Sequence, residues 1–232
     1  MEEGVDPVTI IWAVGLVLLA YVAGSIPTGY WMGLTKGIDI RTVGSGSTGA
    51  TNVLRSVGKK EALVVFIVDI AKGYLPTWSA MALEPSLWSG LGLPPYTIPV
   101  AVAAMPVVGH SRSVFLRFAG GKSAATGLGT CLALNPLAAG MIFAAWIVVL
   151  ASSKIVSLAS IAASAMAPFV FYFCGSAPTI IGFSVVGSLY VVIRHRSNLK
   201  RLMKGTEPRV GKKAEGMDLP ADANLAHRRL NT

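Results

Sequence analysis

Charged side chains are scarce in this sequence of 232 residues, of which only 13% are Asp, Glu, Lys or Arg. Soluble domains usually carry about 25%. Between residues 84 and 194 the only charged side chains are those of Arg112, Arg117, Lys122 and Lys154. Cysteine is also rare, and Cys131 and Cys174 lie in apolar surroundings without metal-ligand spacing. These shortages exclude an ordinary soluble domain, a disordered chain and a disulfide scaffold, and they predict an all-α integral membrane protein.

The charge that is present lies mostly at one end. The net charge is +9, and residues 194–232 hold ten of the twenty Lys and Arg residues. A polybasic segment after a membrane span marks the cytoplasmic side and attracts anionic membrane lipid. No aromatic residues are interleaved with the basic ones, so we expect no nucleic-acid partner. The acidic N-terminus lacks the basic region of a signal peptide, so its first apolar run is expected to stay in the membrane.

Apolar runs predict the membrane spans. They cover residues 8–33, 61–83, 96–116, 123–150, 155–173 and 178–193, and about 20 residues cross a bilayer as a helix. The run 123–150 is too long for one span and contains Asn135-Pro136, where proline would break a helix. We expect this run to form two short spans of about 12–14 residues, which would need local thinning of the bilayer.

The basic loops decide the number of spans. Lys and Arg residues mark the loops near 36–60 and 112–122 as cytoplasmic, whereas the loop 84–96 has no Lys or Arg and fits the outside. Seven transmembrane helices satisfy every loop, with the N-terminus outside and the C-terminus in the cytoplasm. We predict a single integral-membrane domain over 1–204 and a basic, mobile tail over 205–232.

This topology brings four polar segments to one compartment. The first, residues 43–55, carries the string Gly44-Ser45-Gly46-Ser47-Thr48-Gly49 and ends at Arg55. The string has the glycine spacing of a dinucleotide-binding fingerprint, but it follows an expected membrane helix and not a strand. We therefore do not expect a dinucleotide site. Its glycines could instead form a backbone nest for a phosphate, with hydroxyls and Arg55 as further donors. The alternative is a flexible loop that only joins two helices.

The second segment contains Gly120-Gly121-Lys122 just before an expected helix start. A helix N-terminus next to a lysine is an anion site, and Lys122 has little apolar surface beside it on which to snorkel. Arg112 and Arg117 are better read as markers of the membrane interface. His110, without a visible partner, is expected to be structural.

The other two segments are Ser157 to Ser160 and Arg194 to Asn198. Serines in membrane helices often form hydrogen bonds with the backbone of their own helix. This structural role is the alternative to substrate binding for Ser157 and Ser160. Cationic neighbours should lower the pKa of His195, and this histidine could bind a substrate or simply end a helix.

Within the second apolar run, Asp69 and Lys72 are three residues apart and can pair. We expect them to brace the helices.

Taken together, these motifs resemble one family, the membrane-integral bacterial acyl-phosphate:glycerol-3-phosphate acyltransferase. The resemblance runs from residue 25 to about residue 202. It is carried, in order, by Gly44-Ser45-Gly46, Gly49-Ala50-Thr51-Asn52, Arg55, Asp69, Lys72-Gly73, Gly109-His110, Gly120-Gly121-Lys122, Ser157-Leu158-Ala159-Ser160, Arg194-His195-Arg196 and Asn198. Two positions depart from it, because Ser47 stands where the family usually has Asn, and Ser123 where Gly is common.

The resemblance implies a seven-helix protein of the bacterial inner membrane with its active site facing the cytoplasm. It implies transfer of a fatty acyl group from acyl phosphate to the 1-hydroxyl of sn-glycerol 3-phosphate, giving lysophosphatidic acid and phosphate in the first step of phospholipid synthesis. An enzyme that produces acyl phosphate is a candidate partner. By the family pattern Ser45, Arg55, Lys122, His195 and Asn198 line the glycerol 3-phosphate site, and Thr51 and Ser160 lie near the acyl phosphate.

The residues themselves suggest how transfer would occur. No His-x-x-x-x-Asp motif and no Ser–His–Asp spacing supplies a base, but acyl phosphate is already activated. We therefore expect direct transfer without an acyl-enzyme, in which either the donor phosphate or His195 accepts the proton. The catalytic candidates are Lys122, Arg55 and His195. The substrate-binding candidates are Ser45, Gly46, Ser47, Thr51, Asn52, Gly120, Gly121, Ser157, Ser160 and Asn198, with Asp69, Lys72 and His110 as bracing residues.

No cofactor or metal is expected, because paired carboxylates are missing from the cytoplasmic segments. The main alternative function is a membrane transporter of small organic phosphate anions, which would also have broken helices and basic residues. Such transporters usually show inverted repeats and a midplane site, and the sequence shows neither.

Overall fold

The structure, a computed structural model, describes residues 6–83 and 88–210. Glu84, the N-terminal residues 1–5 and residues 211–232 of the expected tail lie outside the described residues. Within them the chain is helical, and no β-strand is formed apart from a single bridge between Ser113 and Ala119. The all-α prediction is therefore confirmed for the part of the chain that is described.

The N-terminal half forms two long helices and several short ones. Helix α1 covers Pro7–Ser25, α2 Thr28–Leu34, α3 Ala50–Ser56, α4 Lys59–Leu83 and α5 Thr97–Ser111. The expected run 8–33 is broken at Ile26-Pro27, because a proline cannot donate the backbone hydrogen bond that would continue α1. The expected run 96–116 is also shorter, since α5 ends at Ser111 and a 3-10 turn, η3, follows at Val114–Leu116.

The described part of the C-terminal half, up to residue 210, has five helices. They are α6 (Ala124–Leu134), α7 (Pro136–Ser153), α8 (Val156–Phe173), α9 (Pro178–Arg194) and α10 (Arg196–Met203). The predicted break at Asn135-Pro136 is present: the Asn135 side chain accepts a hydrogen bond from the Ala138 amide at 3.0 Å and begins α7. Of the two short spans expected within residues 123–150, only α6 is short, with 11 residues. Helix α7 continues to Ser153 and has 18 residues.

The apolar helices of the described residues differ in length. Four of them (Pro7–Leu34, Lys59–Leu83, Pro136–Ser153 and Val156–Phe173) are long and apolar enough to cross a bilayer, and α9 with α10 makes a fifth if the bent pair is one span. Helices α5 and α6 are apolar but shorter. Large apolar side chains such as Ile11, Trp12 and Phe173 are exposed on the outside of the bundle, as expected of a surface that faces lipid. The number of crossings remains a prediction.

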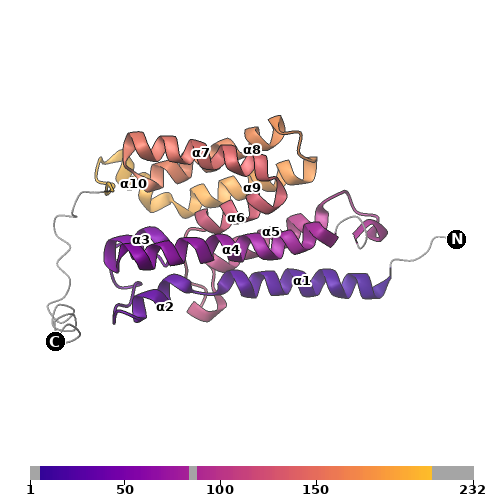
Figure 1. Cartoon of the computed structure of the whole chain (residues 1–232), viewed down its shortest axis with the longest axis horizontal. Helices are drawn as coiled ribbons and strands as arrows, with labels where there is room; N and C mark the ends of the chain where they lie inside the picture. The colour runs from indigo at the N-terminus through magenta and orange to yellow at the C-terminus, as the bar shows by residue number, and fades with distance from the viewer. Residues whose placement is uncertain (1–5, 84–87, 211–232) are drawn as a thin grey trace.

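The helices pack side by side as a bundle. Helix α1 packs along α5, α4 along α6, and α8 lies between α7 and α9. Figure 1 shows α3 and α10 at the same end of the bundle, away from the N-terminus of α1. A core cluster that includes Leu134, Ile142 and Phe171 joins α6, α7 and α8. The four polar segments singled out in the sequence therefore meet at one end of an apolar bundle.

Candidate active site

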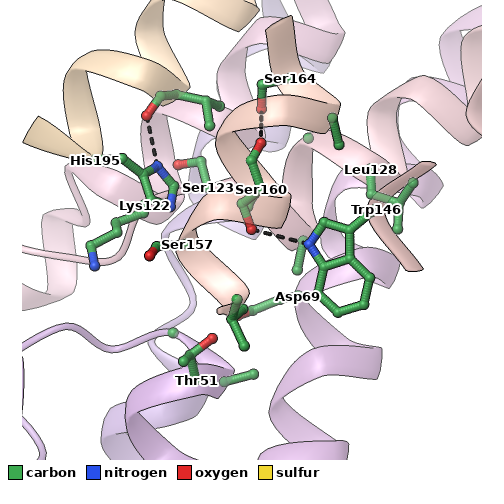
Figure 2. Close-up of a pocket in the computed structure, with 18 of the residues that line it drawn as sticks. Thr51, Asp69, Lys122, Ser123, Leu128, Trp146, Ser157, Ser160, Ser164 and His195 are labelled. Atoms are coloured by element: carbon green, nitrogen blue, oxygen red, sulfur yellow. Dashed lines mark hydrogen bonds between the residues drawn. The ribbon is translucent and has the colours of Figure 1, made fainter. Parts of the chain in front are cut away.

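A cavity of about 500 Å³ begins among these polar segments and continues between the apolar helices. Its volume is within the usual range for ligand-binding sites. Figure 2 shows Lys122, Ser157 and His195 on one side of it and Leu128 and Trp146 on the other. Its polar walls are formed by side chains of Ser45, Ser47, Thr51, Arg55, Lys122, Ser157, His195, Asn198 and Glu207. The cavity thus has a cationic, polar part and an apolar part.

The loop before α3 is organised by Asn52. Its side-chain amide donates to the carbonyls of Ile40, Val43 and Ser47 at 3.0–3.1 Å, and its Oδ1 accepts from the Ser45 amide at 2.9 Å. Asn52 is buried, and these bonds use both ends of its amide group. The side chain of Asn52, a predicted substrate-binding residue, is thus bonded to the loop that it holds.

The segment before α6 is fixed by close packing. The Gly121 amide donates to the His110 carbonyl at 3.0 Å, and a Cβ on Gly121 would collide with the His110 imidazole. Ser123 has a positive φ of 63°, which explains why a glycine would also suit this position, and its hydroxyl donates to the Val107 carbonyl at 2.6 Å. Neither Gly120 nor Gly121 lines the cavity. The two glycines, which were predicted to bind substrate, therefore allow α5 and this segment to approach each other.

Lys122 extends from this segment into the cavity beside the first turn of α6, where Ala124 and Ala125 also line the wall. The first amides of a helix have no partner within it and carry partial positive charge. Lys122 forms no hydrogen bond or ion pair with any residue in the described ranges. Burial, assisted by the positive charge of Arg201, lowers its pKa to about 8. An uncompensated cation at a helix N-terminus is suited to hold an anion.

Arg55, on α3, is a second cation whose charge is not compensated. Its guanidinium donates one hydrogen bond, to the Pro208 carbonyl at 3.3 Å, and has no carboxylate partner in the described part of the chain. Burial lowers its pKa, but an arginine remains charged in proteins. The remaining donors of its guanidinium are available for a phosphate.

His195 stands at the junction of α9 and α10. Its Nδ1 lies 2.8 Å from the Val191 carbonyl. Because a carbonyl oxygen can only accept, Nδ1 carries the proton and Nε2 is left as an acceptor. The pKa of His195 is lowered to about 4, mainly by burial and further by the charge of Lys122. The lowered pKa was expected from the basic neighbours, but burial is its principal cause.

Glu207 lines the cavity although its sequence position did not predict a role in the site. Its carboxylate accepts hydrogen bonds from Ser157 at 2.8 Å, Asn198 at 2.7 Å and Arg201 at 2.7 Å. Its side chain is only 2% exposed, and these donors lower its pKa despite its burial. Glu207 falls within the segment 205–232 that we predicted to be a basic tail. The signal available in the sequence was a single carboxylate close after the basic helix 196–203.

Residues 205–210 follow α10 and lie against the cavity. The Val210 amide donates to the Lys154 carbonyl at 2.8 Å, and the Pro208 carbonyl accepts from Arg55. Ser157 points to Glu207 instead of bonding to its own helix. Segments that lie about 50 and 150 residues apart in the sequence are thereby joined at the mouth of the cavity. We name residues 206–210 the C-terminal strap.

Asp69, Lys72 and His110 form a buried cluster beneath the site. Lys72 Nζ lies 2.8 Å from Asp69 Oδ1 and donates to the Ile26 carbonyl at 3.0 Å. The Nδ1 of His110 lies 3.5 Å from the same carboxylate oxygen. The expected Asp69–Lys72 pair is confirmed, and Asp69 is the partner that the sequence did not reveal for His110.

The apolar part of the cavity lies between α4, α6, α7 and α9. It is lined by Leu63, Phe66, Leu128, Ile142, Phe143, Trp146 and Phe183. The indole of Trp146 donates to the Ser160 hydroxyl at 3.2 Å and stacks on Phe143 at 5.7 Å between ring centroids. Ser160 therefore stands where the polar and apolar parts meet, close to Ser164 in Figure 2.

The structure places most predicted site residues in the cavity wall. They are Ser45, Ser47, Thr51, Asn52, Arg55, Lys122, Ser157, Ser160, His195 and Asn198, together with Asp69 and His110. Gly46, Gly120, Gly121 and Lys72 lie outside the wall. In the described residues no cluster of three or more His, Cys, Asp or Glu side chains could hold a metal ion. The site combines an anion-binding region, a hydrogen-bond acceptor and an apolar chamber, which suits a reaction between a phosphate compound and a lipid.

Comparison with known proteins gives the family. The model of the family "Glycerol-3-phosphate acyltransferase" matches residues 14–205. A glycerol-3-phosphate acyltransferase of Thermosynechococcus vestitus is 47% identical over 198 residues, covering 84% of this chain and 94% of the relative. One of Synechococcus elongatus is 49% identical over 207 residues, covering 86% and 95%.

Two solved structures are similar over the same region. Both are crystal structures of PlsY, an integral membrane glycerol 3-phosphate acyltransferase. The glycerol 3-phosphate form has a TM-score of 0.79 at 36% identity and covers 86% of this chain and 96% of that one. The lysophosphatidic acid form has a TM-score of 0.76 at 35% identity, with coverage of 86% and 95%. This chain is an integral membrane protein that belongs to the glycerol-3-phosphate acyltransferase family.

Proposed function

We propose that this protein transfers a fatty acyl group from acyl phosphate to the 1-hydroxyl of sn-glycerol 3-phosphate, giving lysophosphatidic acid and inorganic phosphate. The observation that carries the proposal is the cavity itself, in which uncompensated cations at one end continue into an apolar chamber. Glycerol 3-phosphate fits the first part by charge, and the acyl chain fits the second by polarity. The PlsY structures, described as glycerol 3-phosphate and lysophosphatidic acid forms, support the same pair of ligands.

The polar end supplies different groups to the two substrates. Arg55 and Lys122, with the first turn of α6, can balance phosphate charge in a partly dry site. His195 Nε2 and Asn198 Oδ1 have no hydrogen-bond partner in the described residues, and each can accept from a glycerol hydroxyl. The Ser160 hydroxyl lies where the polar and apolar parts meet, and there it can contact the acyl-phosphate group.

The reaction then proceeds by direct attack. The 1-hydroxyl oxygen forms a bond with the acyl carbon, the bond between that carbon and the phosphate oxygen breaks, and phosphate leaves. The hydroxyl proton passes to a phosphate oxygen of the donor. Because the pKa of His195 is about 4, its neutral ring is a weak base, which favours a positioning role. Cationic groups near the leaving phosphate lower the barrier most where water is excluded.

We also propose seven spans, with the N-terminus outside and the polar end facing the cytoplasm of a bacterial inner membrane. The excess of Lys and Arg in the segments that meet at this end supports that orientation. An enzyme that produces acyl phosphate would be the partner that supplies the donor. Membrane lipids surround the exposed apolar side chains.

The donor can be tested with purified protein in detergent. Palmitoyl phosphate and glycerol 3-phosphate should give phosphate release that depends on both, and palmitoyl-CoA should fail as donor. Release from palmitoyl phosphate alone would indicate a phosphatase, and turnover with palmitoyl-CoA would refute the donor assignment. Accumulation of glycerol 3-phosphate in protein-containing vesicles without lipid product would instead support the transporter alternative.

A further inference from the structure

Arg194 is a basic residue of the site region for which the proposed mechanism has no use. It is the last residue of α9 and has no carboxylate partner in the described part of the chain. Its Nη2 donates to the Gly121 carbonyl at 3.0 Å and to the Ser111 carbonyl at 3.4 Å. An arginine that only marked the membrane interface would direct its guanidinium to water or lipid headgroups, whereas this one is directed to backbone atoms inside the protein.

The Gly121 carbonyl belongs to the peptide bond that joins Gly121 to Lys122. Two consecutive glycines precede Lys122, and glycine restricts its backbone less than any other residue. The Gly121 amide is fixed by the His110 carbonyl of α5 at 3.0 Å. The carbonyl of the following peptide is fixed by Arg194 of α9. On the far side of Lys122, the Ser123 hydroxyl donates to Val107 at 2.6 Å. Arg194 therefore fixes the peptide plane from which the Lys122 side chain starts.

The end of α9 is itself attached to α5. The Tyr190 hydroxyl forms a hydrogen bond with the Ser111 hydroxyl, one helical turn before Arg194. The same turn continues into His195, which lines the cavity. The position of Lys122 relative to His195 thus depends on a short bridge from α9 to the segment before α6.

We infer that Arg194 is a positioning residue for Lys122, which it holds through the Gly121 carbonyl at the distance from His195 that transfer requires. The inference rests on the proposed function. Displacement of a catalytic group by about 1 Å can reduce turnover by about 100-fold, so the loss of this bridge should lower kcat more than it weakens binding of glycerol 3-phosphate.

The kinetic test uses Arg194→Lys and Arg194→Met, with Arg196→Met as the matched control. Arg196 is exposed two residues further on, so its replacement removes the same charge without touching the Gly121 carbonyl. Both Arg194 variants should lower kcat by about 10-fold or more while the KM for glycerol 3-phosphate changes by less than about 3-fold. Arg196→Met should stay within about 2-fold of the original protein. Normal kcat in Arg194→Lys would overturn the inference, because a lysine keeps the charge but its shorter side chain does not carry a donor to the position of Nη2.

A second readout does not depend on turnover. Lys122 is surrounded by the charges of Arg55, Arg194, Arg201 and Glu207 and by neutral His195, and Arg194 is one of the cations that lower its pKa. The rate at which acetic anhydride modifies Lys122 can be followed over pH by peptide mass spectrometry. The midpoint should rise in Arg194→Met, where a cation is removed. The rate of modification should change in both Arg194 variants, in which Lys122 is no longer held, and remain in Arg196→Met. An unchanged modification profile in both Arg194 variants would contradict the inference.

Failure of the proposed function can be distinguished from failure of the inference about Arg194. If the original protein releases no phosphate in response to glycerol 3-phosphate, the proposed function fails, while the modification of Lys122 still reports whether Arg194 acts on it. If Arg194→Met does not fold, Arg194→Lys decides the question through its kcat, provided that its thermal unfolding midpoint matches that of Arg196→Met.

Discussion

Lys122 and His195 face the same cavity, and burial lowers the pKa of both. At neutral pH Lys122, with a pKa of about 8, is mostly a cation, and His195, with a pKa of about 4, is neutral. The cation can balance a phosphate while the neutral imidazole accepts a hydroxyl hydrogen bond. Both roles are therefore available between these two pKa values, which includes the pH of the cytoplasm.

The charge of Lys122 gives a testable pH dependence. Because the ammonium exists below its pKa, kcat/KM should fall as the pH rises through about 8 in the free enzyme. In Lys122→Arg the guanidinium stays charged, so this decrease in kcat/KM should be absent up to about pH 9. The rate of this variant should be lower than that of the original protein, because a planar guanidinium does not replace the compact ammonium of lysine.

Lys122→Ala is the control for this prediction and should lose about 100-fold or more in kcat at every pH. Phosphate release measured across the pH range checks all three proteins. The same alkaline decrease in Lys122→Arg as in the original protein would assign it to another group, and near-normal rates in Lys122→Ala would count against the site.

His195→Ala should raise the KM for glycerol 3-phosphate more than it lowers kcat. The loss of one hydrogen bond of about 0.5–1.5 kcal/mol corresponds to about a 2- to 13-fold change. Titration with glycerol 3-phosphate at saturating donor separates the two constants, and exposed Ser197→Ala provides the matched control. A collapse of kcat at constant KM would make His195 the base.

Among the structural elements, the C-terminal strap and the end of α10 complete the polar side of the cavity. The strap is held by hydrogen bonds from Ser157 to Glu207, 50 residues away, and from Arg55 to Pro208, 153 residues away. Neither hydrogen bond could be predicted from local sequence patterns, because the partners are so far apart in the sequence. The break between α6 and α7 was predictable because both of its causes, an N-capping asparagine and a proline, lie at the break itself.

Glu207→Ala should destabilise the protein by about 1–3 kcal/mol, since it leaves the donors of Asn198 and Ser157 buried without an acceptor. We expect a lower thermal unfolding midpoint together with a higher KM for glycerol 3-phosphate. Glu207→Gln retains one acceptor oxygen and should be milder, and Arg209→Ala, exposed in the same strap, should change neither quantity. An active, fully stable Glu207→Ala would show that the strap is dispensable.

At the scale of the whole molecule, scarcity of charge predicted both the membrane environment and the end at which the site forms. The ends of the six apolar runs agree with helix ends to within three residues except at residue 116, and the basic loops grouped the polar segments that the structure brings together. The shape of the cavity could not be predicted, because it depends on how α4, α6, α7 and α9 are packed. The structural role of Asn52 could not be predicted either, because the carbonyls to which its side chain donates come together only when residues 40–47 are folded.

The proposed orientation predicts which loops are accessible from outside the cell. In a protein whose Cys131 and Cys174 have been replaced by Ala, Gly90→Cys should react with a membrane-impermeant maleimide in intact cells, because a side chain at this position meets open space. Lys59→Cys, exposed at the polar end, should react only after the cells are permeabilised. The opposite pattern would reverse the topology.

Direct transfer between two substrates held in one cavity is the central claim, and initial rates test it most directly. Phosphate release is measured while palmitoyl phosphate and glycerol 3-phosphate are varied together. Because both must be bound before reaction, double-reciprocal plots should give intersecting lines. Parallel lines would reveal a covalent acyl-enzyme formed before the acceptor binds, and would contradict the account.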